Sequence, residues 1–185
     1  MKKKVIYSII IVSVIIILSV AVTYAVYTFS GVVNISGTSE CFDVNYVKGQ
    51  DIGSDSNPAN FVLANNYTEG LSSVIKVNLK DTCTITNGTG TLYLNTDTSV
   101  TSSTILSGKV LKYQVLDGTT PVGSGVVSSA ENIEIYKDIP ITTTVKTITV
   151  YIWLDGNLVT EQNQNEILSS VYKGHISMDI KSGDK

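Results

Sequence analysis

The chain has 185 residues, which leaves room for one domain after a leading segment. Its thirteen basic residues are all lysines, three of them at positions 2–4, and it carries sixteen acidic residues, so the remainder is acidic. This balance excludes a nucleic-acid partner, because such a protein needs a basic surface and the bidentate contacts that arginine makes.

The first predicted element is a hydrophobic segment that follows the leading lysines. It runs from Val5 to about Tyr27 without a charged residue. As a helix it would span roughly 34 Å, enough to cross a bilayer. Lysines on its leading side place the bulk of the chain outside the cell. We therefore expect residues 1–27 to be a signal peptide or single-pass membrane anchor, and residues 28–185 to be an extracellular domain.

The fate of this segment has two alternatives. Thr23 and Ala25 are small residues at the positions that a signal peptidase recognises, which predicts cleavage after Ala25. The apolar run is long for a signal peptide, so retention as a membrane anchor is the other reading. Both export the rest of the chain, either into the medium or onto the cell surface.

Two cysteines, Cys41 and Cys83, lie in the exported part. An even number in an oxidising compartment predicts a disulfide. Closing the loop between Cys41 and Cys83 would stabilise the fold by roughly 4 kcal/mol in the chain-entropy model. The alternative is two buried free thiols.

Period-two alternation of apolar and polar residues recurs along the exported part, which is rich in β-branched residues. The strongest strand is predicted over Val145–Leu154, with one aliphatic face and one face of threonine and aromatic residues. Trp153 lies on the second face and should be at least partly covered. Further strands are expected around residues 42–46, 75–79, 111–115, 133–135 and 176–180.

Turn formers separate these strands. The pairs Asn87-Gly88, Asp117-Gly118 and Asp155-Gly156 each predict a tight hairpin. Ile167 and Leu168 should anchor one short helical turn, and residues 96–107 read as a surface excursion. The pattern predicts an all-β fold, an antiparallel β-sandwich of jelly-roll or Ig-like kind preceded by one N-terminal hydrophobic helix.

Motifs for chemistry are missing. The only histidine, His175, lies on the polar face of a predicted strand and should face solvent. A catalytic zinc site usually needs more than one imidazole, and a Ser-His-Asp arrangement would need this same residue. HExxH, GxSxG and phosphate-binding glycine loops do not occur. We predict no catalytic residues, no metal and no cofactor, and hence a protein that is not an enzyme.

Both ends of the chain resemble a known family. Residues 24–30 read YAVYTFS, and the C-terminal part contains YIWLDG at 151–156 and YKGHIS at 172–177. These motifs resemble TasA/camelysin-type surface and biofilm-matrix proteins of Gram-positive bacteria, which have a Lys-led apolar leader and an aromatic-rich start. The resemblance covers the ends; the middle matches only in its general β character.

The resemblance implies a jelly-roll domain that assembles into matrix fibres, in which the N-terminal strand of one subunit completes the sheet of the next. Here residues 26–37 would be that strand, with Val33 and Ile35 on one face; the alternative is that it folds back into its own domain. The expected function is a non-catalytic cell-surface or extracellular-matrix structural protein that self-associates. The alternative is a secreted adhesin or a carbohydrate- or protein-binding module. A camelysin-type secreted protease is less favoured, because no zinc motif supports it.

Overall fold

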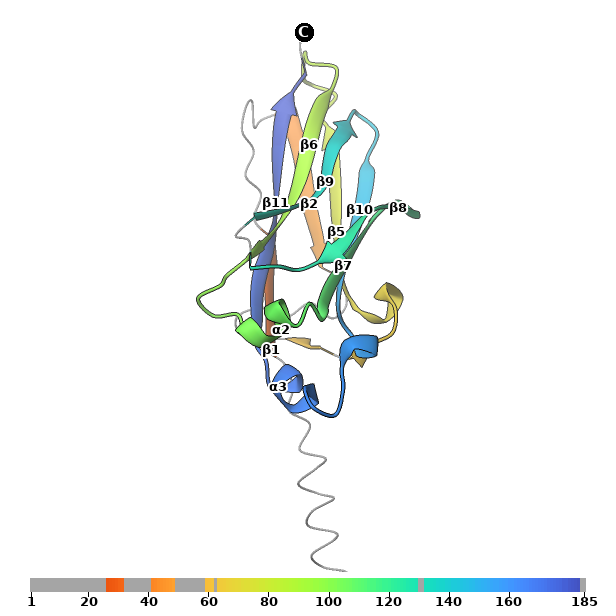
Figure 1. The fold of residues 1–185 in the computed structure, drawn as a ribbon. Coiled ribbons are helices and arrows are strands. Elements are labelled where there is room, and N and C mark those ends of the chain that lie inside the picture. The colour runs from red at the N-terminus through yellow and green to blue at the C-terminus, as the bar shows by residue number, and fades with distance from the viewer. Residues whose placement is uncertain (1–25, 32–40, 49–58, 62, 130–131, 184–185) are drawn as a thin grey trace, which may run out of the picture.

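The computed structural model describes residues 26–31, 41–48, 59–61, 63–129 and 132–183. In this part of the chain, strands form two sheets that pack face to face (Figure 1). The first sheet has the order β3 (Ala59–Asn60), β1 (Val26–Gly31), β11 (Tyr172–Ser182), β6 (Gly88–Thr96) and β9 (Asn132–Ile141). The second has the order β2 (Phe42–Lys48), β5 (Leu71–Leu79), β10 (Lys146–Asp155), β7 (Leu111–Asp117) and β8 (Thr120–Val126), with β4 (Leu63–Ala64) beside β10.

Strand pairing is antiparallel at most positions, and two pairs are parallel: β1 with β11 and β4 with β10. The predicted all-β, mostly antiparallel two-sheet fold is therefore confirmed. The expected N-terminal hydrophobic helix and the boundary near residue 27 lie outside the described residues or at their edge. Within the described ranges, no helix is long and apolar enough to cross a membrane.

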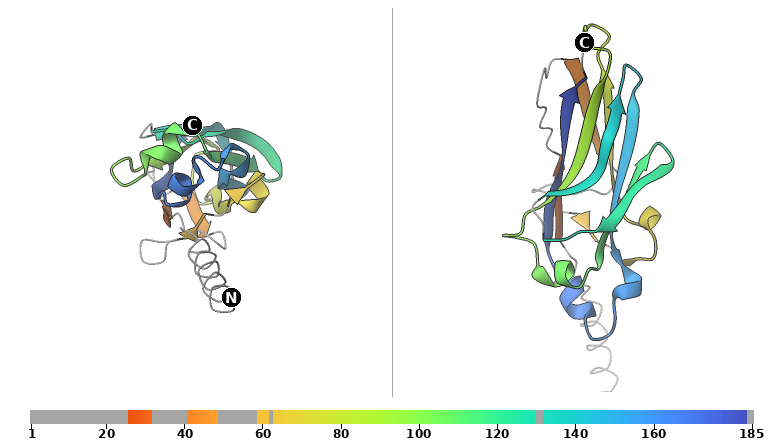
Figure 2. Two further views of the ribbon diagram at one scale, coloured as in Figure 1. Left: turned by 60° about the horizontal axis from the view of Figure 1, so that its bottom comes forward. Right: turned by 45° about the horizontal axis from the view of Figure 1, so that its top comes forward.

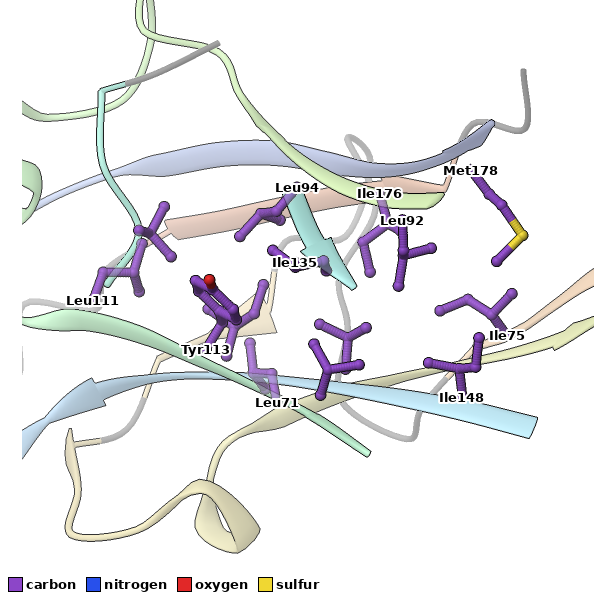
Figure 3. Close-up of a cluster of buried hydrophobic side chains, with 14 of the residues drawn as sticks. Leu71, Ile75, Leu92, Leu94, Leu111, Tyr113, Ile135, Ile148, Ile176 and Met178 are labelled. Atoms are coloured by element: carbon purple, nitrogen blue, oxygen red, sulfur yellow. The ribbon is translucent and has the colours of Figure 1, made fainter. Parts of the chain in front are cut away.

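The core forms where the apolar faces of the two sheets meet. In β5 the burial alternates as the sequence predicts, with Ile75, Val77 and Leu79 buried. Figure 3 shows Ile75 and Ile148 of the second sheet facing the cluster of Leu92, Ile176 and Met178 from the first. Side chains in a strand alternate between the two faces of a sheet. The apolar residues of each strand therefore point into the layer between the sheets, and the polar residues point outward.

The strongest predicted strand is confirmed as β10. Ile148, Val150, Ile152 and Leu154 are buried between the sheets. Trp153 on the other face is 9% exposed, so it is covered as expected. β10 lies between β5 and β7, in the middle of its sheet.

One of the three predicted hairpins is confirmed. Asp117 ends β7 and Gly118 follows with φ +60°, so the pair turns the chain directly into β8. Gly118 is needed here because a side chain strains that backbone conformation.

The other two hairpin predictions were wrong. Gly88 begins β6, which pairs with β11 and β9, whereas the preceding β5 belongs to the other sheet. A Cβ atom at position 88 would lie 2.6 Å from the Phe42 ring, so this glycine serves packing. Asp155 ends β10 but caps the 3-10 helix η3 (Gly156–Leu158) by accepting a hydrogen bond from the Asn157 N–H at 3.1 Å.

Two short helices, α2 (Ser103–Ser107) and α3 (Gln164–Leu168), lie together at one end of the sandwich, opposite the C-terminal end of β11 (Figures 1 and 2). The predicted helical turn around Ile167 is confirmed, and this side chain is buried. The reading of residues 96–107 as a surface excursion was wrong in part, because Ile105 of α2 is also buried in the core. Another short helix, η2 (Tyr67–Glu69), lies on the outer face of the second sheet beside β10.

Candidate functional site

The N-terminal strand β1 lies near the edge of the first sheet. It pairs in parallel with β11 over five positions, from Tyr27 opposite Tyr172 to Gly31 opposite Ile176. On its other side, β3 pairs with it at two positions only. The main chain of β11 is therefore the principal partner of β1, and in this structure that partner belongs to the same chain.

Several predicted site residues lie beyond this strand. The candidate cleavage residues Thr23 and Ala25 precede it, and the candidate strand-addition residues Val33 and Ile35 follow it; all four fall outside the described residues.

The two predicted disulfide residues are bonded to each other. Cys41 and Cys83 form a disulfide with a Cα–Cα distance of 5.6 Å. Cys41 directly precedes β2, an edge strand of the second sheet, while Cys83 lies in the link that carries the chain from β5 to β6 in the first sheet. The Lys80 N–H also donates to the Cys41 carbonyl at 2.9 Å. The bond thus fixes the edge strand β2 to the crossing between the sheets.

A polar hollow of about 600 Å³ opens on the outer face of the first sheet. Three parts of the chain form it: the ends of β6 and β11 that pair with each other, the turn after β6, and the first residue of β9. The lining residues are Asn95, Thr96, Asp97, Thr98, Ser99, Asn132, Lys173, Gly174, His175 and Ser177. We call this feature the β6–β11 hollow.

Hydrogen bonds hold several of these side chains in place. Asn95 Nδ2 donates to Ser177 Oγ at 2.8 Å, and both residues are buried. Asp97 Oδ1 accepts from the Ser99 N–H at 3.1 Å and from the Ser99 hydroxyl, and Asp97 Oδ2 lies 3.7 Å from Lys173 Nζ. The hydrogen bond from the Ser99 side chain, helped by Lys173, keeps the pKa of Asp97 below its usual value. The turn is thereby ordered around a carboxylate that stays ionised.

His175 lies on the outer face of β11, as its place on the polar face of the strand predicted, and it is half-buried in this hollow. Burial lowers the pKa of His175 below its ordinary value, and the nearby negative charge of Asp97 opposes that shift. Its imidazole makes no hydrogen bond to any described residue. In the described part of the chain, no group of three histidine, cysteine or acidic residues is placed to hold a metal ion.

A second feature lies on the outer face of the other sheet. The Tyr67 ring packs against Tyr151 edge to face, with centroids 5.2 Å apart, and against Trp153 at 6.5 Å. This contact explains how Trp153 is covered although it points away from the core. Tyr67 belongs to η2, which the sequence did not predict.

Chain comparison with protein-family models, with curated proteins and with solved structures found no match. The fold and the sites above define an all-β, two-sheet protein with one disulfide.

The sequence did not indicate the β6–β11 hollow. Its charged pair, Asp97 and Lys173, stands 76 positions apart in sequence and meets only through the pairing of β6 with β11. The one usable signal was the run of polar residues on alternate positions of β11, from Lys173 to Asp179. That run indicates an outward face of β11, but it does not indicate the turn after β6 that forms one side of the hollow.

Proposed function

We propose that this protein is a non-catalytic structural protein of the cell surface or extracellular matrix, and that it self-associates by β-strand addition. Its domain would be a jelly-roll or Ig-like sandwich, exported by the N-terminal hydrophobic segment and either anchored by it or released. The resemblance of both chain ends to TasA/camelysin-type proteins supports this proposal.

The observation that carries the proposal is the position of β1. This strand is the first to follow the candidate cleavage site, and it lies beside β11 with only the two positions of β3 on its other side. Strand addition draws its affinity from main-chain hydrogen bonds, which are the same whichever copy of the chain supplies the strand. A second copy could therefore donate β1 to β11 with the register seen here.

The chain provides a connection for such an exchange. Residues 32–40 separate β1 from Cys41. When extended, a segment of this length reaches up to roughly 30 Å, at about 3.3 Å per residue. The disulfide of Cys41 fixes the other end of the connection to the sandwich. Exchange of β1 between copies would then leave the strands that follow Cys41 in their places in the two sheets.

Assembly can be tested on protein that begins at Val26, compared with protein that begins at residue 38. Light scattering and electron microscopy should show oligomers or fibres for the first, because each copy offers a strand. Removal of residues 26–37 should abolish growth, since no strand remains to donate. Strict monomers of the longer form under all conditions would contradict the proposal.

A further inference from the structure

The β6–β11 hollow is built like a binding site for a neutral, hydroxyl-rich ligand. We propose that it binds a saccharide. The inference does not depend on strand addition, because all the side chains that it uses belong to β6, β9, β11 and the turn after β6. A monomer and a fibre would present the same hollow.

The charges of the hollow favour an uncharged ligand. Lys173 and Asp97 compensate each other across 3.7 Å, and burial favours the neutral form of His175. An anion would meet the Asp97 carboxylate as well as the ammonium group, so it gains little from either. A metal ion is disfavoured too, since no group of three suitable ligands occurs in the described chain.

Unused hydrogen-bonding groups converge on this space. Among the described residues, the His175 imidazole and the Asn132 amide make no hydrogen bonds, and the Asn95 side-chain oxygen accepts none. Asn95 is only 7% exposed, so an unpaired oxygen there is costly unless a ligand or water supplies a donor. A sugar hydroxyl both donates and accepts, which matches this mixture of amide, imidazole, carboxylate and ammonium groups.

A tyrosine lies on the same face of the sheet, next to residues that line the hollow. Tyr93 of β6 stands directly opposite Ser177, a lining residue, and the next pair on the same face of the ladder is Asn95 opposite His175. Directly opposed residues in a sheet share one face, so Tyr93 lies on the outer face beside the hollow. It is half-buried, which leaves part of its surface for the apolar face of a sugar ring.

The single histidine makes the test direct. The full chain, held in a detergent without a sugar headgroup, is titrated with tetrasaccharides of β-1,4-linked glucose, α-1,4-linked glucose and β-1,4-linked N-acetylglucosamine. NMR follows the one imidazole signal. At least one tetrasaccharide should shift this signal saturably, because the ring lines the site. Asn132→Ala and Asp97→Asn should each weaken binding about tenfold, as expected for a lost ligand hydrogen bond.

The matched control is Asn45→Ala, which removes an exposed amide from β2 on the other sheet and should leave binding unchanged. A circular dichroism spectrum and a cooperative urea transition like those of the unsubstituted protein show that each variant has folded. If Asn132→Ala does not fold, Asp97→Asn alone decides. Three outcomes overturn the proposal: no shift with any tetrasaccharide, binding that Tyr151→Ala abolishes while Asn132→Ala does not, or saturable shifts with inorganic phosphate or calcium alone.

Discussion

The buried ring of Tyr172 occupies the space that a side chain at Gly174 would need. A Cβ atom there would lie 2.4 Å from the Tyr172 hydroxyl and 2.7 Å from the Asn95 carbonyl oxygen. The same hydroxyl lies 3.2 Å from Thr96 Oγ1, so the ring is fixed between β11 and β6. This glycine near the start of β11 thus lets β11 and β6 carry a buried tyrosine beside the β6–β11 hollow.

Gly174→Ala should therefore destabilise the fold. One of the two close atoms is main chain of a paired strand and cannot move without cost, so we expect a loss of about 2–3 kcal/mol. Urea denaturation measures it. Gly156→Ala is the matched control, because its nearest contact would be 3.4 Å, and its stability should stay within about 0.5 kcal/mol. Equal effects of both substitutions would contradict this account of Gly174.

The disulfide should contribute measurably to stability. Cys41 and Cys83 are 42 positions apart, and a loop of that length corresponds to about 4 kcal/mol in the chain-entropy model. Denaturation with and without reductant should show a loss of this order. The double variant Cys41→Ala, Cys83→Ala should have the same stability as the reduced protein, and reductant should not change that stability. If the unreduced protein is no more stable than the double variant, the disulfide does not contribute to stability and the prediction is contradicted.

The pH dependence of His175 has a definite sign. Burial lowers its folded-state pKa below 6.5, so the unfolded chain binds the proton more readily. The contribution to stability is present above about pH 6.5 and is lost as the pH falls through the window below it. NMR titration of the single imidazole should give a pKa below that of a free histidine.

Asp97→Asn provides the check on the cause. Because the Asp97 charge raises the pKa of His175, its removal should lower that pKa further. A folded-state pKa at or above 6.5 would contradict burial as the main cause, and a rise of the pKa in the variant would contradict the effect assigned to the Asp97 charge.

The single tryptophan reports on η2. Trp153 is 9% exposed, and the Tyr67 ring lies 6.5 Å from it on the outer face of the second sheet. Tyr67→Ala should expose Trp153, shift its emission to longer wavelength and raise acrylamide quenching, with a stability loss of about 1 kcal/mol. Leu158→Ala, at an already exposed side chain, serves as the control. Unchanged emission in the Tyr67 variant would show that other groups cover Trp153.

The sequence predicted the strands better than their connections. Alternation identified the buried face of β10 because one buried layer requires every second residue to be apolar. The Asp-Gly turn signal correctly identified the turn at Gly118, where the backbone conformation requires a glycine. The Asn-Gly signal failed at Gly88, where glycine is required because the Phe42 ring leaves no room for a side chain. A dipeptide carries no information on which sheet the next strand joins.

The candidate sites show the same division. An even number of cysteines, together with the expectation of export, predicted the bond between Cys41 and Cys83 that the structure contains. The β6–β11 hollow depends on the register that places Asn95 opposite His175 and on the turn that holds Asp97 near Lys173. Register arises from pairing between distant segments, so a single sequence does not reveal it.

Strand addition by β1 is tested most directly by cross-linking two separately purified variants, Thr28→Cys and Lys173→Cys, each of which adds one cysteine to a chain that keeps the Cys41–Cys83 disulfide. These positions are register partners in the β1–β11 pair. A mixture of the two, oxidised under assembly conditions, should give covalent heterodimers, because residue 28 of one copy lies beside residue 173 of another. A mixture of Lys76→Cys and Thr147→Cys, partners in the β5–β10 pair, should give none. If only a double variant with Thr28→Cys and Lys173→Cys in one chain cross-links, and the mixture stays monomeric, β1 remains in its own domain and the account is contradicted.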